Sequence, residues 1–146
     1  METRVKIHEA QPQAWKAMYT LSGYVESTPV DKTRKELIKI RASQINGCAF
    51  CIDMHTKEAL KIGETTQRIF LLNAWKETDL FTAEEKAVLQ LTEEVTLIHQ
   101  GGVKEATYQQ AEQLFGTEYV AQLIMNIVTI NAWNRIAIST QMQPAK

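Results

Sequence analysis

The sequence is poor in helix-breaking residues and in cysteine. Its 146 residues include only 6 glycines and 3 prolines, so long uninterrupted helices are possible. The 2 cysteines, Cys48 and Cys51, are too few for the disulfide framework of a small secreted domain. They stand in one C-x-x-C motif, where they either pair locally or carry chemistry. These scarcities exclude a disulfide-stapled scaffold and favour a helical protein.

The sequence also lacks an excess of charge and a long apolar run. Lys and Arg number 16 and Asp and Glu 17, a formal net charge of -1, without the basic excess typical of proteins that bind nucleic acid or membranes. The N-terminal residues contain no apolar segment of the kind that marks a secretory signal. The most apolar stretch, 119–133, is interrupted by polar residues and falls short of the about 20 residues that span a bilayer. We therefore expect a cytoplasmic protein with a single domain over residues 1–146 that binds neither nucleic acid nor membranes.

Helix signals follow one another along the chain, and no segment shows the period-2 alternation of a strand. Pro12 can begin a helix that fades near Gly23. A second helix runs from about Asp31 to Asn46-Gly47, a pair that suits a left-handed helix end. Five more are predicted over 48–63, 65–75, 82–101, 104–115 and 117–139, and a T-x-x-E capping box opens the third of these. We therefore predict an all-α fold of about six or seven helices, with residues 141–146 frayed.

The predicted last helix is apolar in almost every direction around its axis, at Val120, Leu123, Ile124, Ile127, Val128, Ile130, Trp133, Ile136 and Ile138. A helix of this kind is buried on all sides, which is hard to achieve within one small subunit. We therefore expect part of it to lie in a subunit interface, although the central helix of a monomer would give the same pattern. Asn131, Asn134 and Arg135 either line a pocket or form hydrogen bonds in that interface, and we favour the interface.

The residues that point to chemistry lie between Glu36 and His55. On a helix that begins at Cys48, Cys51 lies three residues further on and His55 four beyond that, so the three side chains share one face. Free N–H groups at a helix start favour a thiolate at Cys48, and a neighbouring His can accept a thiol proton. Glu36 lies one predicted helix earlier. It approaches the cysteines only if the two helices cross at an angle, which the sequence leaves open.

Several interpretations of this motif compete. The thioredoxin type of C-x-x-C follows a β-strand, and no strand is predicted. Haem attachment needs a His directly after the second cysteine, where Ile52 stands. Zinc binding by Cys48, Cys51, His55 and Glu36 and a pair of buried structural cysteines stay open beside thiol redox chemistry.

The pattern E-x11-C-x-x-C-x3-H resembles the alkylhydroperoxidase AhpD-like family, which belongs to the carboxymuconolactone decarboxylase superfamily. The flanking Asn46-Gly47 and the segment Asp53-Met-His-Thr-Lys57 carry the same resemblance. It is specific over about residues 37–78 and extends loosely to the helix from Thr82 and to residues 131–135. It implies an AhpD-like all-α fold that assembles as a trimer or hexamer, in agreement with the helix pattern and the apolar last helix.

The resemblance also implies a peroxiredoxin-type thiol peroxidase or disulfide reductase of antioxidant defence. Cys51, with His55 one turn further on, corresponds to the peroxidatic cysteine, whose thiolate cleaves the O–O bond of a hydroperoxide and becomes a sulfenic acid. Cys48 corresponds to the resolving thiol that condenses with it to a disulfide, and Glu36 to the acid/base of a proton relay. A dithiol donor, in the best-known members a lipoyl-bearing protein, then reduces the disulfide. No cofactor and no metal is expected.

One position departs from the family pattern. The best-known members carry a second His between the cysteines, where this chain has Phe50. The relay is then incomplete and the site more apolar, which favours organic hydroperoxides over hydrogen peroxide. The helix dipole alone would make Cys48 the more acidic thiol, whereas the neighbouring His55 favours Cys51. The alternatives are a lactone decarboxylase of the same superfamily, which does not depend on a C-x-x-C, and a non-catalytic redox-sensing or zinc-binding oligomer.

Overall fold

Helices make up all the regular structure in a computed structural model that describes residues 4–146. The long helices are α2 (Pro12–Ser27), α3 (Lys32–Asn46), α4 (Ala49–Lys61), α6 (Ala83–Thr96), α7 (Glu105–Phe115) and α8 (Thr117–Ser139). The short ones are α1 (Ile7–Ala10), α5 (Thr66–Phe70) and two 3-10 helices, η1 (Leu72–Glu77) and η2 (Ile98–Gln100). The described residues form no strand, which confirms the predicted all-α class. None of the helices within this range is long and apolar enough to cross a membrane.

The caps of the main helices include two that the sequence predicts, the capping box at Thr82 and the left-handed end at Gly47. Asp31 precedes α3, and its side chain accepts a hydrogen bond from the backbone N–H of Arg34. Thr82 and Glu85 make both hydrogen bonds of the capping box at the start of α6. α3 ends at Gly47, whose φ of 72° is left-handed, as the Asn-Gly pair predicts. These caps give partners to backbone groups that helix ends would otherwise leave unpaired.

Helix α2 is longer than predicted. It passes through Gly23 and continues to Ser27, whereas the sequence predicts that it fades at Gly23. A glycine inside a helix costs only about 1 kcal/mol relative to alanine. The added turn buries Val25, which is 2% exposed, so packing outweighs the local propensity.

The helix predicted over residues 65–75 is broken, and α6 is shorter than predicted. Ile69, Leu72 and Trp75 are all buried and stand three residues apart, a spacing that suits the three residues per turn of a 3-10 helix. The chain accordingly changes from α5 to η1, with a kink at Ala74. The predicted helix up to Gly101 ends at Thr96, and η2 fills the interval.

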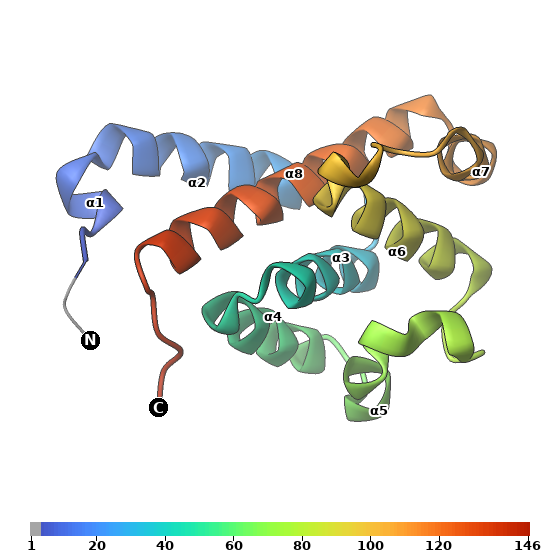
Figure 1. The fold of residues 1–146 in the computed structure, drawn as a ribbon, viewed down its shortest axis with the longest axis horizontal. Helices are drawn as coiled ribbons and strands as arrows, with labels where there is room; N and C mark the ends of the chain where they lie inside the picture. Colours follow the sequence, from blue (N-terminus) through green and yellow to red (C-terminus); the bar gives the residue numbers. More distant parts are fainter. Residues whose placement is uncertain (1–3) are drawn as a thin grey trace.

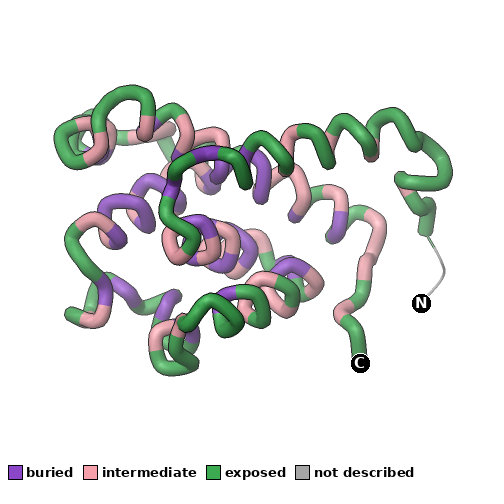
Figure 2. The backbone as a smooth tube through the Cα atoms, turned by 180° about the vertical axis from the view of Figure 1, so that it is seen from behind, coloured by how far each residue is buried: buried purple, intermediate pink, exposed green. Residues whose placement is uncertain are grey.

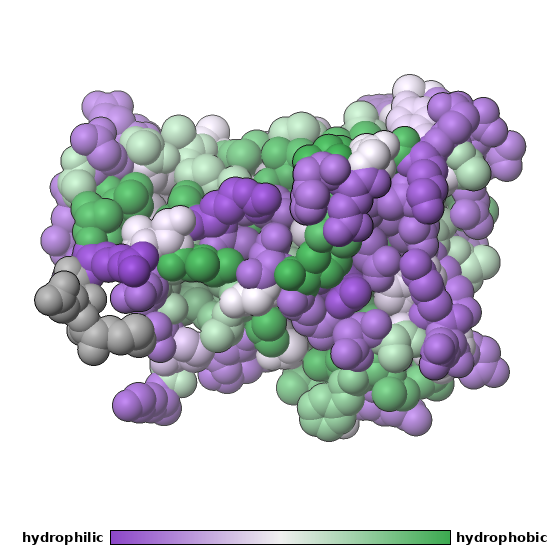
Figure 3. Space-filling model, in the orientation of Figure 1, coloured by the Kyte–Doolittle hydropathy of each residue, from purple (hydrophilic) through white to green (hydrophobic). Residues whose placement is uncertain are grey.

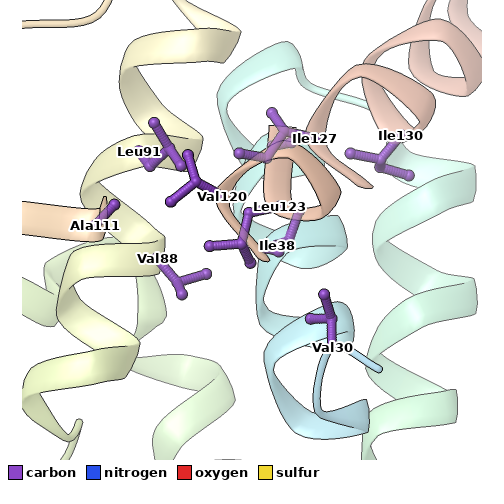
Figure 4. Packing of buried hydrophobic residues seen from close by; sticks show 10 residues of the cluster. Val30, Ile38, Val88, Leu91, Ala111, Val120, Leu123, Ile127 and Ile130 are labelled. Carbon is purple, nitrogen blue, oxygen red and sulfur yellow. The ribbon is translucent and has the colours of Figure 1, made fainter. Parts of the chain in front are cut away.

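Helix α3 lies at the centre of the molecule, with α4, α6 and α8 packed around it (Figure 1). The two parallel helices α3 and α8 are joined near both ends, because Arg34 donates to the Tyr119 hydroxyl at 3.0 Å and Asn46 to Asn134 at 2.9 Å. Figure 4 shows the core that they share with α6 and α7, which includes Val30, Ile38, Val88, Leu91, Ala111, Val120, Leu123, Ile127 and Ile130. This packing fixes the end of α3 that precedes the cysteine motif.

Helix α8 is not covered on all sides within one chain. Leu123 and Ile127 face the core at 0% exposed, whereas Val128 and Ile138 are 41% and 43% exposed. Figure 3 shows hydrophobic side chains that reach the surface in several places between hydrophilic ones, and most of α2 is exposed as well (Figure 2). The predicted subunit interface stays a prediction, and Val128 and Ile138 are the α8 residues that it would cover.

We expect Gly47→Ala to destabilise the protein and Gly23→Ala to stabilise it. The left-handed φ of Gly47, 72°, costs a residue with a Cβ atom about 1–2 kcal/mol. Gly23 lies inside α2, and an added Cβ would meet nothing within 4 Å, so alanine there should add about 0.5–1 kcal/mol. Urea unfolding of the two variants and the wild type measures both changes. Effects of the same sign would contradict the backbone assigned to these two positions.

Candidate redox site

A sharp corner between α3 and α4 places the two cysteines. The backbone N–H of Gly47 donates to the carbonyl of Gln44 at 3.3 Å, and that of Cys48 to the carbonyl of Ser43 at 2.9 Å. Together with the left-handed glycine, these bonds form a Schellman motif. The motif ends α3 and turns the chain at once into α4. Cys48 is the N-cap of α4, and its Sγ accepts a hydrogen bond from the backbone N–H of Cys51 at 3.3 Å.

Asparagine side chains fasten this corner to α8. The amide of Asn46 donates to Oδ1 of Asn131 and to Oδ1 of Asn134, both at 2.9 Å. Asn134 is 0% exposed and donates in turn to the hydroxyl of Ser43 at 2.9 Å. Arg135 donates to the side chain and carbonyl of Asn131. The sequence assigns the three α8 residues to a subunit interface, but these hydrogen bonds lie within one chain, because α8 runs beside the end of α3.

A disulfide joins Cys48 and Cys51, whose Cα atoms are 5.3 Å apart. Both residues are almost fully buried, at 1% and 4% exposed. They cluster with Ala137 of α8 and are flanked by Phe50 and Met142. Met142 belongs to the tail that the sequence predicts to be frayed, but its N–H donates to the carbonyl of Ala137 at 2.9 Å. This bond folds the start of the tail against the disulfide.

His55 and Glu36 meet beside the cysteines. Nδ1 of His55 lies 3.2 Å from Oε2 of Glu36, and the two side chains are only 15% and 13% exposed. Neither atom has a hydrogen-bond partner elsewhere in the described part of the chain. Helices α3 and α4 therefore pack so that Glu36 reaches His55, one turn beyond Cys51.

A buried lysine completes the polar side of the site. Lys39 Nζ lies 3.2 Å from Oε1 of Glu36 and 2.8 Å from Oε1 of Glu26. Burial raises the pKa of Glu36, but contact with His55 and the charge of Lys39 outweigh it, so the pKa lies below its ordinary value. Burial lowers the pKa of Lys39, but the two carboxylates outweigh it and raise the pKa above its ordinary value. Sequence reasoning missed Lys39, whose position three residues after Glu36 on a helix was the available signal.

Cys51 and His55 line a cavity of about 310 Å³ between α2, α3, α4, α8 and the C-terminal tail. Its wall is mostly apolar, and aromatic rings supply much of it. Trp15, Tyr19 and Trp133 contact one another there, with ring centroids 5.1 to 5.9 Å apart. Cys48 is not among the lining residues. Cys51 is therefore the cysteine that lines a space for a small molecule.

The geometry does not favour the zinc interpretation. Zinc binding would need Cys48, Cys51, His55 and Glu36 around one ion. Across residues 4–146, no three His, Cys, Asp or Glu side chains converge in the manner of a metal site. The two sulfurs are instead joined to each other. His55 and Glu36 form their own contact at 3.2 Å.

The helices, the buried C-x-x-C disulfide and the His–Glu pair at the wall of an apolar cavity define an all-α protein with a dithiol–disulfide site. The model of the carboxymuconolactone decarboxylase family matches residues 12–94, more than half of the chain. The chain belongs to this family, and its structure is AhpD-like, which confirms the resemblance drawn from the motif.

Similar proteins agree with this assignment. The chain is 45% identical over 139 residues to the uncharacterized protein YdfG of Bacillus subtilis (strain 168), with 95% of each chain covered. A protein of unknown function from Agrobacterium tumefaciens, provisionally assigned as the antioxidant defence protein AhpD, matches with a TM-score of 0.95 and 37% identity over 99% of both chains. An uncharacterized peroxidase-related protein with an AhpD core, from Ralstonia eutropha JMP134, has a TM-score of 0.81 at 17% identity over 95% of this chain and 74% of that one. The last similarity concerns the fold alone.

We expect Glu36→Gln to lower the free energy of unfolding at neutral pH and to have less effect in acid. Because folding lowers the pKa of Glu36, its carboxylate adds stability above the unfolded pKa, and this is lost as pH falls through the folded pKa. The loss at neutral pH should be about 1–2 kcal/mol, since glutamine still offers Lys39 one acceptor. Urea unfolding from about pH 3 to pH 7 checks this. A difference between variant and wild type that stays constant over this range would contradict a buried, ionised Glu36.

Proposed function

We propose that the protein is an AhpD-like thiol peroxidase that reduces organic hydroperoxides in antioxidant defence. One observation carries this proposal. Cys51 and His55 line the same cavity, and Cys48, which is bonded to Cys51, does not line it. The cavity volume of about 310 Å³ stands at the lower end of the ~300–1,000 Å³ of small-molecule sites, which suits a small organic peroxide. The similarity to the A. tumefaciens protein, provisionally assigned to AhpD, supports the same activity.

In the proposed cycle, the thiolate of reduced Cys51 attacks the O–O bond of the hydroperoxide. A sulfur–oxygen bond forms and the O–O bond breaks, so Cys51 becomes a sulfenic acid and the alkoxide leaves as an alcohol after it takes up a proton. The Cys48 thiol then condenses with the sulfenic acid, which forms the disulfide and releases water. A dithiol donor exchanges with this disulfide, restores both thiols and is itself oxidised to a disulfide.

His55 and Glu36 are proposed to move the protons of this cycle. Because Nδ1 of His55 faces Glu36, Nε2 is the nitrogen left to take the thiol proton of Cys51 and to give a proton to the leaving alkoxide. The carboxylate orients the ring and stabilises its protonated form, while Lys39 holds the other carboxylate oxygen. A thiol served by such a base reacts as the thiolate at a lower pH than a free cysteine.

The burial of the disulfide favours a slender electron donor. Cys48 and Cys51 are 1% and 4% exposed, so the surface of another folded protein cannot reach their sulfur atoms directly. The cavity at Cys51 gives a path to a dithiol on a flexible arm. A lipoyl group attached to a protein is a dithiol of this shape, and we propose it as the donor.

A homo-oligomer, a trimer or a hexamer, is part of the same proposal. Val128 and Ile138 on α8 are 41% and 43% exposed, and apolar side chains gain free energy when a partner removes them from water. A second copy of the chain would cover them. A cytoplasmic location also belongs to the proposal, because reducing surroundings would return the cysteine pair to its thiol form.

The alternative is a lactone decarboxylase, the activity after which the family is named. That reaction does not depend on a pair of cysteines, so Cys48 and Cys51 would have no part in it. Their pairing beside His55 and the cavity favours thiol chemistry instead. A redox sensor without turnover, the other alternative, would form the disulfide once per peroxide but would not consume dithiol continuously.

We expect Cys48→Ser and Cys51→Ser each to reduce catalytic peroxide consumption by at least about 100-fold, because the cycle uses both thiols and residues that act as a unit fail together. The measurement is the loss of hydroperoxide with dihydrolipoic acid as reductant. In the wild type, one dithiol should be oxidised for each peroxide consumed. Full activity in both variants would overturn the proposed function.

The same two variants also separate the roles of the cysteines. The chain has only 2 cysteines, so each variant carries a single thiol that mass spectrometry can follow. After one equivalent of peroxide, dimedone should label Cys51 in the Cys48→Ser protein. It should leave Cys48 of the Cys51→Ser protein almost unlabelled, because Cys48 does not line the cavity. Label on Cys48 alone would reverse the assigned roles.

We expect cumene hydroperoxide to be reduced at least about tenfold faster than hydrogen peroxide, the scale of discrimination that an apolar pocket supplies. Phe50 lines the cavity where the best-known family members carry a histidine. Phe50→His should narrow the ratio of the two rates, whereas the matched control Phe50→Leu, which keeps the wall apolar, should preserve it. Comparable rates for the two peroxides with the wild type would contradict this expectation.

A further inference from the structure

An asparagine in the wall of the Cys51 cavity has a side-chain oxygen without a hydrogen-bond partner among the described residues. Asn126 of α8 lines the cavity and is 2% exposed, and its Oδ1 makes no hydrogen bond among the described residues. Leaving a buried carbonyl oxygen unpaired costs about 1–3 kcal/mol, and native proteins pair almost all such groups. Because Asn126 lines the cavity, a bound molecule can supply the partner that the described residues do not give this oxygen.

The orientation of the Asn126 amide follows from its other end. Nδ2 donates to the backbone carbonyl of Gln122 at 2.8 Å. A flipped amide would place an oxygen against that carbonyl oxygen, where neither could donate. The atom left without a partner is thus the acceptor. A molecule that pairs with it must carry an O–H or N–H donor.

Three donors among the residues that line the cavity are already engaged. The hydroxyl of Thr129 donates to a carbonyl one turn earlier on α8 at 2.7 Å. Lys39 donates to two carboxylates, and the indole N–H of Trp133 donates to the hydroxyl of Ser22 at 2.8 Å. These three donors therefore do not serve Asn126.

Asn126 and the disulfide mark different ends of the cavity along α8. Asn126 and Ala137 both line it, and Ala137 packs against the disulfide. Three helical turns, about 16 Å, separate these two residues. Ile130 and Trp133 lie between them on the same wall. A ligand that reaches from Cys51 to Asn126 is therefore elongated and mostly apolar.

We propose that Oδ1 of Asn126 recognises the substrate, an elongated apolar molecule with a hydrogen-bond donor at the end remote from its reactive group. That the reactive group is a hydroperoxide, placed at Cys51, rests on the proposed function. The donor is a hydroxyl or an amide N–H. Asn126 then determines which hydroperoxides bind and has no part in cleaving the O–O bond.

Ligand binding by the disulfide form tests this inference without turnover. 1-Octanol and heptyl methyl ether are isomers of the same size, and only the alcohol can donate a hydrogen bond. Trp15 and Trp133 line the cavity, so tryptophan fluorescence reports occupancy. The wild type should bind the alcohol about fivefold more tightly than the ether, which corresponds to one hydrogen bond. Asn126→Leu should abolish this preference.

Thr129→Val is the matched control, because Thr129 lies on the same wall but its hydroxyl proton is used within α8. This variant should keep the preference for the alcohol. Equal affinity of the wild type for the two isomers, or a preference that survives Asn126→Leu, would overturn the inference. The wild-type comparison needs no variant, so a folding defect in Asn126→Leu cannot hide the result. The binding experiment contains no peroxide, so equal binding of the two isomers would not contradict the peroxidase proposal. Conversely, a lack of peroxidase activity would not contradict a measured preference for the alcohol.

Discussion

The corner at Gly47 is the constraint on which the geometry of the site depends. Its left-handed backbone lets α3 end and α4 begin with only Cys48 as an additional residue between them. Because the chain turns back so abruptly, α4 packs along α3, and Glu36 before the corner meets His55 behind it at 3.2 Å. A longer connection would let α4 shift along α3, and the carboxylate would lose its contact with the ring. The position of Cys51 against the cavity depends on the same turn.

Two buried asparagines of α8 differ in how completely their side-chain amides are hydrogen-bonded. Asn134 is 0% exposed, and both ends of its amide are paired, with Asn46 and with Ser43. Such a satisfied network stabilises one arrangement of the helices over others. Asn126 lies two turns earlier, is equally buried, and has one end of its amide unpaired beside a cavity. The first amide fastens the corner, and the second is the one that we propose to bind a ligand.

Local sequence signals predict much of this fold, because caps and helix periodicity are local properties. The capping box at Thr82 and the left-handed Gly47 both appear as expected. The misplaced boundaries have non-local causes. The continuation of α2 beyond Gly23 buries Val25, which no count of neighbouring residues reveals, and the break between α5 and η1 serves the burial of Leu72.

In the candidate site, too, local features could be predicted from the sequence and non-local ones could not. The spacing of Cys48, Cys51 and His55 indicates that they share a helix face, and the structure joins the cysteines and places His55 in the same cavity wall as Cys51. The contact between Glu36 and His55 depends on the packing of two helices, so the sequence could only leave it open. The cavity is harder still to predict from the sequence, because α2, α4, α8 and the tail come together only in the folded chain. Met142, which belongs to a tail expected to be frayed, is part of that wall.

The surroundings of His55 bear on how the proposed peroxidase would exchange protons with Phe50 in place of a histidine. Toward the cavity the surroundings are apolar and aromatic, with Phe50 in the wall. Toward α3, a line of polar contacts runs from His55 through Glu36 and Lys39 to Glu26, at 3.2, 3.2 and 2.8 Å. The side chain of Glu26 is 60% exposed, so this line joins the ring to solvent, and Lys39 and Glu26 themselves line the cavity. In the proposed cycle, this line of contacts would supply protons to His55, so an apolar wall at Phe50 could select organic molecules without isolating His55 from water.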